Sequence, residues 1–412
     1  MDSNKNILVI SFYTNLPGSC QAEWVDDRIK ELISSGYHVT LISSSGVFTH
    51  SDKNIRHIKI PCISPHGANS EYKEIKSRGI KIGFLLNTYY QILSFFDKLL
   101  KLLGLRTGEG RWNWAIMGMI SIFHKHKKYS FIYSTGGPAS VHVLGILYSK
   151  LFSTRLLLEL QDPLTGDDIG RNNLSKFGLS IFEKIFIKNS HKTIYCTENA
   201  SNFSKKAHPK FADKICHIYP GSYFTNRHQI TAPNNEKIRF TYLGSLYATR
   251  NVTKLIQAIK MLYQTDPNYL DKFKIDLYGN IEKKILNEII NFQFDVFNIY
   301  GLVPREKALE EALNSDILLL IQNTDNRSMN TIPFKTYDYL RSGKLIFGLT
   351  HKNNEINLIL ENHNHIVSKG NDSKDIFIKL KHIIDNLDDL KCDIIDSELT
   401  PKKAVEKMLE LI

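Results

Sequence analysis

The chain has 412 residues, which is long for one hydrophobic core, so two domains of roughly 200 residues each are expected. An apolar content of 42% and a charged content of 23% are ordinary for a folded globular protein and argue against a disordered chain. The formal net charge of +11 favours an acidic partner, which could be nucleic acid, an anionic membrane surface or a phosphorylated substrate.

The five cysteines are scattered and form no C-x-x-C pair. This pattern fits a reducing compartment and predicts neither a zinc site nor a disulfide framework. Residues 1–6 are polar and run directly into an apolar segment, which is unlike a signal peptide. We therefore expect a cytoplasmic protein.

The first half opens with a strand, a loop, a helix and a second strand. Ile7–Ile10 is the first apolar run, the loop at 11–20 contains Gly18, and helical spacing over 21–35 leads to a strand at 39–42. Ligands of open α/β sheets bind at the carboxyl ends of strands, so the Gly18 loop is a candidate substrate loop. No G-x-G-x-x-G lies between a strand and a helix, which disfavours NAD binding.

The most apolar segment of the chain is Ile82–Leu103, with a broad apolar stripe and a narrow polar face. Its uncharged part is too short to span a bilayer. Two readings remain open, a helix packed in the core and a helix at a membrane interface. Basic residues with Trp112 and Trp114 follow it, so residues 80–128 are the candidate membrane-contact region.

The second half restarts the alternation of strands and helices after a polar break at 222–237, which we interpret as a linker. Ile238–Leu243 is a strand, Gly244 begins a loop that carries Arg250, and a helix follows over 252–263. A glycine after a strand, a helix N-terminus and a cation together favour an anion. The other reading of Arg250 is an ordinary surface residue.

The most informative stretch is TIPFKTYDYLRSGK, residues 331–344. Pro333 excludes a helix start before Phe334, Gly343 marks the helix end, and an apolar strand is predicted at 345–349. Lys335 and Asp338 lie three apart near the helix N-terminus. That arrangement suits a phosphate and a pair of sugar hydroxyls, although a solvated helical pair would have the same spacing.

This stretch resembles the donor segment of retaining glycosyltransferases of the GT-B fold, family 4-like, whose common form is Ile-Pro-x-Lys-x-x-(Glu/Asp)-Tyr-Leu-x-x-Gly-Lys. The resemblance implies an α/β protein with two Rossmann-like domains facing a central cleft. Residues 1–221 would form the acceptor-side domain, 222–237 the linker and 238–395 the nucleotide-sugar donor domain. Residues 396–412 would form a helix that crosses back to the first domain.

The resemblance also assigns site residues. Asp338 would bind the nucleotide ribose, and Lys335 would meet the diphosphate and act in catalysis. The remaining donor residues would be Gly18, Gly244 and Arg250 near the phosphates, Val303 at the nucleobase edge, and Asn330 where the family often has a second Glu.

On the acceptor side, the resemblance points to two residues that follow strands of the first half. Gly137 lies in the run after the strand at 131–134, and Asp162 follows the strand at 156–160. Asp162 would lie beside the transferred sugar and the acceptor and act in catalysis. Its carboxylate could equally cap the following loop. His142, among apolar neighbours, reads as a packed core histidine.

The implied activity is retaining transfer of a sugar from a nucleotide-diphosphate sugar to a glycan or polyprenyl-linked acceptor. The resemblance places it in bacterial surface polysaccharide biosynthesis, such as O-antigen, capsule or lipopolysaccharide, with peripheral contact at the cytoplasmic face of the inner membrane. The sequence has no Asp-x-Asp, so we expect no metal and no cofactor. An alternative is a catalytically inactive GT-B scaffold, for which Asn330 is the main support. A nucleic-acid-binding protein is disfavoured because no basic motif is interleaved with aromatic residues.

Overall fold

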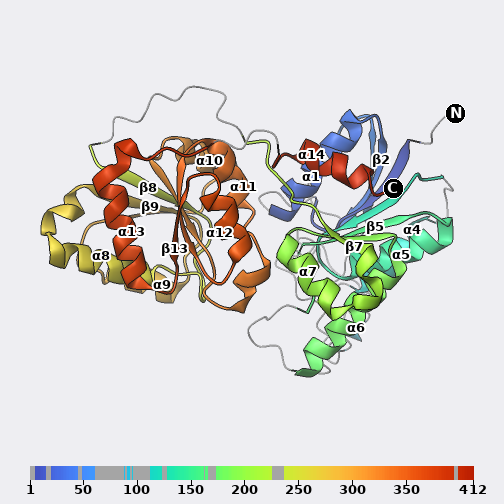
Figure 1. Ribbon diagram of the computed structural model, residues 1–412. Coiled ribbons are helices and arrows are strands. Elements are labelled where there is room, and N and C mark those ends of the chain that lie inside the picture. The colour runs from blue at the N-terminus through green and yellow to red at the C-terminus, as the bar shows by residue number, and fades with distance from the viewer. Residues whose placement is uncertain are drawn as a thin grey trace. The chain divides into compact units, whose positions relative to one another are not determined.

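The computed structural model describes residues 5–14, 20–44, 49–60, 88, 91–92, 95, 112–122, 128–161, 163–165, 173–224, 236–393 and 398–412 (Figure 1). The chain forms two compact units. The first comprises residues 1–219 together with 401–412, and the second comprises residues 220–400.

The first unit is built on a parallel sheet with the strand order β3-β2-β1-β4-β5-β6-β7. Its strands are β1 Asn6–Ile10, β2 His38–Ser44, β3 Ile55–Ile60, β4 Ile132–Thr135, β5 Leu156–Leu160, β6 Lys192–Tyr195 and β7 Ile215–His217. The apolar run Ile7–Ile10 is fully buried, as expected of a parallel strand covered on both faces.

Helices cover both faces of this sheet (Figure 1). They are α1 Cys20–Ser34, α4 Trp112–Ile122, α5 Ser140–Phe152, α6 Asn173–Asn189, α7 Glu198–Ala207, a 3₁₀ turn at Pro209–Lys214, and α14 Pro401–Leu409. One core lies between the sheet and the helices α1 and α14, and the other lies between the sheet and α4, α5 and α6.

The second unit repeats the plan with the parallel order β10-β9-β8-β11-β12-β13. Its strands are β8 Ile238–Leu243, β9 Phe273–Tyr278, β10 Phe297–Gly301, β11 Ile317–Ile321, β12 Leu345–Thr350 and β13 Ile366–Lys369. The chain fills the sheet outward in one direction from β8 and in the other from β11, so the strand order reverses between these two neighbours.

The helices of the second unit are α8 Thr253–Thr265, α9 Lys283–Ile290, α10 Arg305–Leu313, α11 Lys335–Ser342, α12 Asn354–Glu361 and α13 Ser373–Asn386, with 3₁₀ turns at Pro267–Asp271, Asn326–Asn330 and Leu387–Asp389. The start and end of α11 confirm the prediction. Phe334 is the residue before the helix, and Gly343 ends it with φ of 71°.

The division into units differs by a few residues from the predicted one. Ser222, which was assigned to the linker, belongs to the second unit because its backbone N–H donates to the Leu399 carbonyl and its hydroxyl donates to Asp338. Helix α14 packs on α1 within the first unit.

Most of the apolar segment 82–103 lies outside the described residues. Four of its residues are described as helical, and two of them, Ile92 and Phe95, are 51% and 63% exposed. Ile92 belongs to the predicted apolar stripe, so that part of the stripe faces outward. None of the helices in the described ranges is long and apolar enough to cross a membrane.

Candidate functional site

The candidate site lies at the carboxyl edge of the second sheet, where the strand order reverses between β8 and β11. Parallel α/β sheets bind ligands outside the strand ends at such a point. Three segments start from this edge: the loop after β8, the loop after β11, and helix α11. Five of the predicted donor residues fall on these segments, namely Gly244, Arg250, Asn330, Lys335 and Asp338.

Lys335 reaches from the first turn of α11 to the end of β8. Its Nζ donates to the Leu243 carbonyl and lies 3.8 Å from the centroid of the Tyr242 ring. Neither partner carries a negative charge. Burial, together with the positive charge of Arg250, holds the pKa of Lys335 well below its usual value. A bound anion would reverse that shift, because it would stabilise the charged form of the lysine.

Gly244 makes this close approach possible. Its φ is 129°, a conformation that side-chain-bearing residues rarely adopt, and a Cβ at this position would lie 2.7 Å from the Lys335 Nζ. The glycine after β8 therefore lets the ammonium group rest against the backbone at the strand end.

Arg250 supplies a second cation on the loop after β8. Tyr247 and Arg250 exchange backbone hydrogen bonds of 3.0 Å, which close the loop, and the guanidinium lies 5.5 Å from the centroid of the Tyr247 ring. The Nε of Arg250 is buried and has no hydrogen-bond partner in the described part of the chain. A buried donor of this kind costs about 1–3 kcal/mol, so a ligand oxygen that accepts from it would be favourable.

The carboxylate of Asp325 links the loops after β8 and β11, and its negative charge is paired with Arg327. Asp325 accepts a hydrogen bond from the Thr249 hydroxyl and pairs with Arg327 at 2.7 Å. Hydrogen bonds from Arg327 and Thr249 lower the pKa of Asp325 to about 2. Asp325 thus fixes the two loops together, with Arg327 as its cationic partner.

Two buried amides hold the backbone on either side of Asn330. Gln322 Nε2 donates to the Ser328 and Thr331 carbonyls at 3.1 and 2.9 Å, and Asn353 Nδ2 donates to the same two carbonyls at 2.6 and 2.9 Å. Sequence reasoning missed both amides. The signal for Gln322 was available, since it is the first polar residue after an apolar strand at the predicted ligand edge.

Asp338 lies three residues after Lys335 on α11 but has different partners. Its Oδ1 accepts from the Ser222 hydroxyl at 2.6 Å and from Arg305 at 3.0 Å, and the residue is only 2% exposed. Oδ2 has no hydrogen-bond partner among the described residues, and the ribose role of Asp338 stays a prediction. Ser222 and Arg305 were missed because they lie 116 and 33 positions away in the chain.

Val303 lies two residues before Arg305, which pairs with Asp338. It follows β10, and β9 separates β10 from β8 in the sheet. Beside it, Tyr300 stacks on Tyr278 with 4.5 Å between ring centroids and 5° between ring planes. The nucleobase role of Val303 stays a prediction.

On the first unit, Gly137 occupies an open position after β4. A Cβ added there would meet no atom of the described residues within 4 Å. The strand ends beneath it are fixed by a buried carboxylate, because Glu159 accepts from the Thr135 hydroxyl at 2.7 Å and pairs with Arg28 at 3.3 Å.

Three other residues of the first unit were singled out from the sequence: Gly18, Asp162 and His142. Gly18 and Asp162 lie outside the described residues. His142 is buried, and burial lowers its pKa to about 3, so it is a neutral core histidine as predicted.

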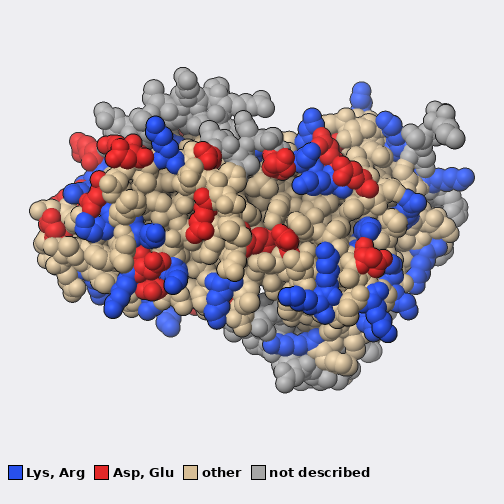
Figure 2. Space-filling model, in the orientation of Figure 1, with Lys and Arg blue, Asp and Glu red and all other residues tan. Residues whose placement is uncertain are grey.

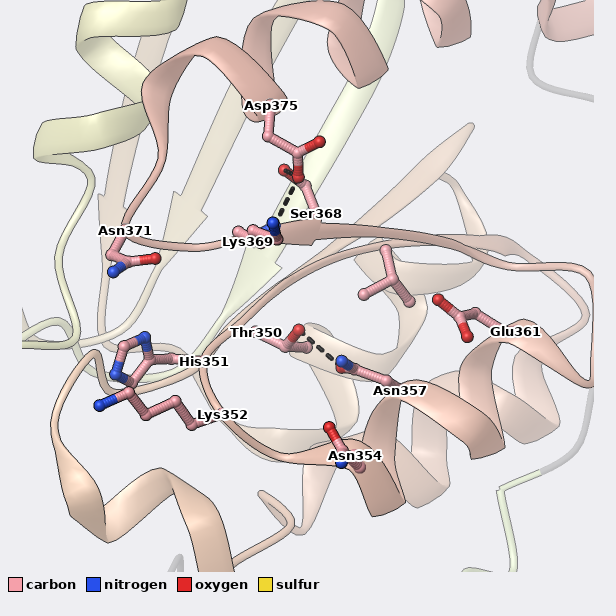
Figure 3. A pocket seen from close by; sticks show the side chains of 11 residues that line it. Thr350, His351, Lys352, Asn354, Asn357, Glu361, Ser368, Lys369, Asn371 and Asp375 are labelled. Carbon is pink, nitrogen blue, oxygen red and sulfur yellow. Dashed lines mark hydrogen bonds between the residues drawn. The ribbon is translucent and has the colours of Figure 1, made fainter.

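A separate polar pocket of about 510 Å³ opens at the carboxyl edge of β12 and β13 (Figure 3). Figure 3 shows His351, Lys352 and Asn371 at one end of it and Glu361 at the other. None of the predicted site residues lines this pocket. It is connected to the Asn330 loop through the Ser328 hydroxyl, which donates to the His351 carbonyl at 2.6 Å.

No protein-family model and no curated protein sequence matches this chain. Solved structures do match over nearly the whole length. Sucrose-phosphate synthase from Thermosynechococcus elongatus is 11% identical, with 99% of this chain and 94% of that one covered and a TM-score of 0.61. The chain therefore has the GT-B fold.

Two further GT-B structures show the same extent of similarity. Anabaena HepE in complex with UDP and glucose is 11% identical, with both chains fully covered and a TM-score of 0.53. WaaG, a glycosyltransferase involved in lipopolysaccharide biosynthesis, is 10% identical, with 97% and 93% covered and a TM-score of 0.54. The predicted GT-B fold is confirmed, whereas membership of family 4 stays a prediction.

Among the described residues, no group of three or more His, Cys, Asp and Glu side chains is placed to hold a metal ion. The basic side chains of Lys335 and Arg250 lie at the end of β8 and on the loop that follows it.

Proposed function

We propose that this protein is a retaining glycosyltransferase. It would move a sugar from a nucleoside-diphosphate sugar to a hydroxyl of a glycan or polyprenyl-linked acceptor, in bacterial surface polysaccharide biosynthesis. The GT-B fold supports this proposal, as do the glycosyltransferases with similar structures, one of which was solved with UDP and glucose.

One observation carries the proposal: two cations at the carboxyl edge of β8 have no carboxylate partner among the described residues. Lys335 rests on a carbonyl and an aromatic ring, and Arg250 keeps a buried N–H without an acceptor. A diphosphate would supply the missing negative charge. Such fixed donors stabilise a leaving group without a metal ion.

In the proposed reaction, the bond between the anomeric carbon and the diphosphate oxygen breaks while the acceptor hydroxyl attacks from the same face. The acceptor proton passes to the departing phosphate oxygen. Lys335 and Arg250 stabilise the charge that develops on the diphosphate, and Asp338 Oδ2 binds the ribose. Gly137 and Asp162 would lie on the acceptor side, and no side chain needs to act as a nucleophile.

The test is thermal stabilisation by a panel of nucleoside diphosphates and nucleotide sugars. A ligand that binds only the folded state should add about 2.7 kcal/mol at 100 times its dissociation constant. Stabilisation by one nucleotide, weakened in Arg250→Gln, is expected. The matched control is Arg239→Gln, because Arg239 pairs with Asp276 and Glu311 at the opposite, amino-terminal end of β8. An absence of stabilisation by every nucleotide would overturn the proposal.

Retention of the anomeric configuration and independence of metal ions are tested by two further measurements. The anomeric configuration of the product, followed by NMR, should match that of the donor. Activity should survive EDTA, and dependence on added Mn²⁺ or Mg²⁺ would contradict a diphosphate held by Lys335 and Arg250 alone.

The alternative is an inactive GT-B scaffold that still binds a nucleotide. Asn330 favours it, because an amide cannot supply the charge of the Glu often found at this position in the resembling family. Slow hydrolysis of a bound nucleotide sugar would support the enzyme, whereas tight binding without hydrolysis or transfer would support the scaffold.

A further inference from the structure

Helix α6 (Asn173–Asn189) is apolar on both sides. Its inner side contributes Leu179, Phe186 and Ile187, which are buried against the sheet of the first unit. Its outer side carries Phe177, Ile181 and Ile185, which are 65%, 43% and 44% exposed. A helix on the surface of a globular protein ordinarily has polar residues on its outer side, so this outward apolar stripe needs an explanation.

The three exposed residues form one continuous stripe. They are spaced four residues apart, which places them on one side of the helix over a length of about 12 Å. At the end of the neighbouring helix α5, Leu151 is a further apolar residue and is 54% exposed.

Among the described residues of α6, the exposed charges on this side are positive. Lys184 and Lys188 are exposed beside the stripe. The single carboxylate of α6, Glu183, is fully buried and accepts hydrogen bonds from Tyr195, Ser204 and Thr165. Basic side chains gather over α5, α6 and α7 in the view of Figure 2.

We propose that the outer side of α6 docks on an anionic lipid bilayer, with Phe177, Ile181 and Ile185 entering the interface and Lys184 and Lys188 contacting lipid headgroups. This apolar and basic pattern is the one that interfacial helices use. Three side chains on one helix cannot cover the roughly 800 Å² per partner of a stable protein interface. The charge and the small area therefore favour a membrane over a second copy of the chain.

The surface deepens the proposed function, because a lipid-linked acceptor is presented at a membrane. The idea that α6 brings the enzyme to its acceptor rests on the proposed glycosyltransferase function. The binding of α6 to a membrane does not depend on that function. The two can fail separately: nucleotide stabilisation tests the donor site, and vesicle binding tests α6.

The experiment is co-sedimentation of the full chain with vesicles of phosphatidylglycerol and phosphatidylcholine, compared with pure phosphatidylcholine. The wild type should bind the anionic vesicles more tightly. The double variant F177S/I181S should bind at least tenfold more weakly. K184E/K188E should lose about 25-fold or more, from about fivefold per lysine.

Matched controls come from the second unit. L358S/I378S replaces two residues that are 57% and 59% exposed, and K283E/K284E reverses two exposed lysines of α9. Both controls should bind vesicles like the wild type. Retained nucleotide stabilisation and an unchanged circular dichroism spectrum show that each variant is folded.

Three results would overturn the proposal. The first is equal binding by the wild type and F177S/I181S, and the second is binding that ignores lipid charge. The third is a wild type that binds no vesicles but self-associates through α6, as shown by a smaller size in gel filtration for F177S/I181S. That outcome would assign the surface to a second copy of the chain.

Discussion

Arg305 donates to Asp338 across 3.0 Å, and this ion pair joins the start of α10 to the middle of α11. The Asp338 side chain is 3% exposed and that of Arg305 is 35% exposed. Because Ser222 donates to the same oxygen, Asp338 holds three separate segments of the second unit together. The predicted ribose ligand is therefore also a structural residue.

Replacing Asp338 should cost stability as well as affinity. We expect Asp338→Ala to lower the free energy of unfolding by about 1–3 kcal/mol, since two hydrogen bonds are lost but Arg305 can still reach water. Asp338→Asn, which keeps an acceptor for Ser222, should lose less. Urea unfolding measures both, with Asp295→Ala as the control because its carboxylate is 91% exposed. If Asp338→Ala unfolds like the wild type, the ion pair with Arg305 contributes nothing.

Replacing Lys335, unlike replacing Asp338, should lower nucleotide affinity without lowering stability. Lys335→Met removes an ammonium group that burial destabilises, so the free protein should be at least as stable as the wild type. Affinity for the nucleotide should fall about 10-fold to 150-fold, as for a lost charged hydrogen bond. Calorimetric titration gives the affinity. Lys344→Met is the control, since burial also lowers the pKa of Lys344 but its side chain lies beyond the end of α11.

Binding of a diphosphate should take up a proton at Lys335. The pKa of this lysine is depressed in the free protein, and a bound anion raises it. Over the pH range between the two values, affinity should therefore weaken as the pH rises. Titrations in buffers of different ionisation enthalpy would show the uptake, which should disappear in Lys335→Met. Unchanged uptake in that variant would place the proton elsewhere.

His365 should make the second unit sensitive to acid. Burial lowers its pKa to about 3, against about 6.5 in the unfolded chain, so the unfolded state binds more protons between these values. The free energy of unfolding should fall as the pH drops through this window. In His365→Gln the slope should decrease by about 1.4 kcal/mol per pH unit. Urea unfolding across the window tests this, with His382→Gln, an exposed residue, as the control.

Two glycine variants separate backbone strain from ligand contact. Gly244→Ala introduces a Cβ 2.7 Å from the Lys335 Nζ at a φ of 129°, so it should lower the free energy of unfolding by about 1–3 kcal/mol and weaken nucleotide binding. Gly137→Ala meets no atom of the described residues within 4 Å and should leave the free energy of unfolding within about 0.5 kcal/mol of the wild type. If Gly137 lies beside the acceptor, this variant should raise the KM for the acceptor alone. An unchanged KM would argue against that role.

The local structure around α11 could be predicted because short-range rules decide it. Pro333 lacks an N–H, Gly343 adopts the left-handed conformation, and the apolar run after Lys344 can only be a buried strand. The same rules predicted the alternation of strands and helices in both halves, and hence two parallel sheets. The sequence also predicted an anion site at Lys335, because a lysine in the first turn of a helix favours a bound anion.

Other features depend on residues that are distant in the chain and were decided by the tertiary structure. The sequence left Asp338 as either a ribose ligand or part of a solvated helical pair, and it gave no sign that Ser222 and Arg305 both donate to one of its carboxylate oxygens. Phe177, Ile181 and Ile185 are apolar residues spaced four apart, and only the position of α6 on the sheet decides that they lie on its exposed side. Sequence thus determined where the elements begin and end through local backbone geometry, whereas the tertiary structure decided which side chains are buried, because burial depends on long-range packing.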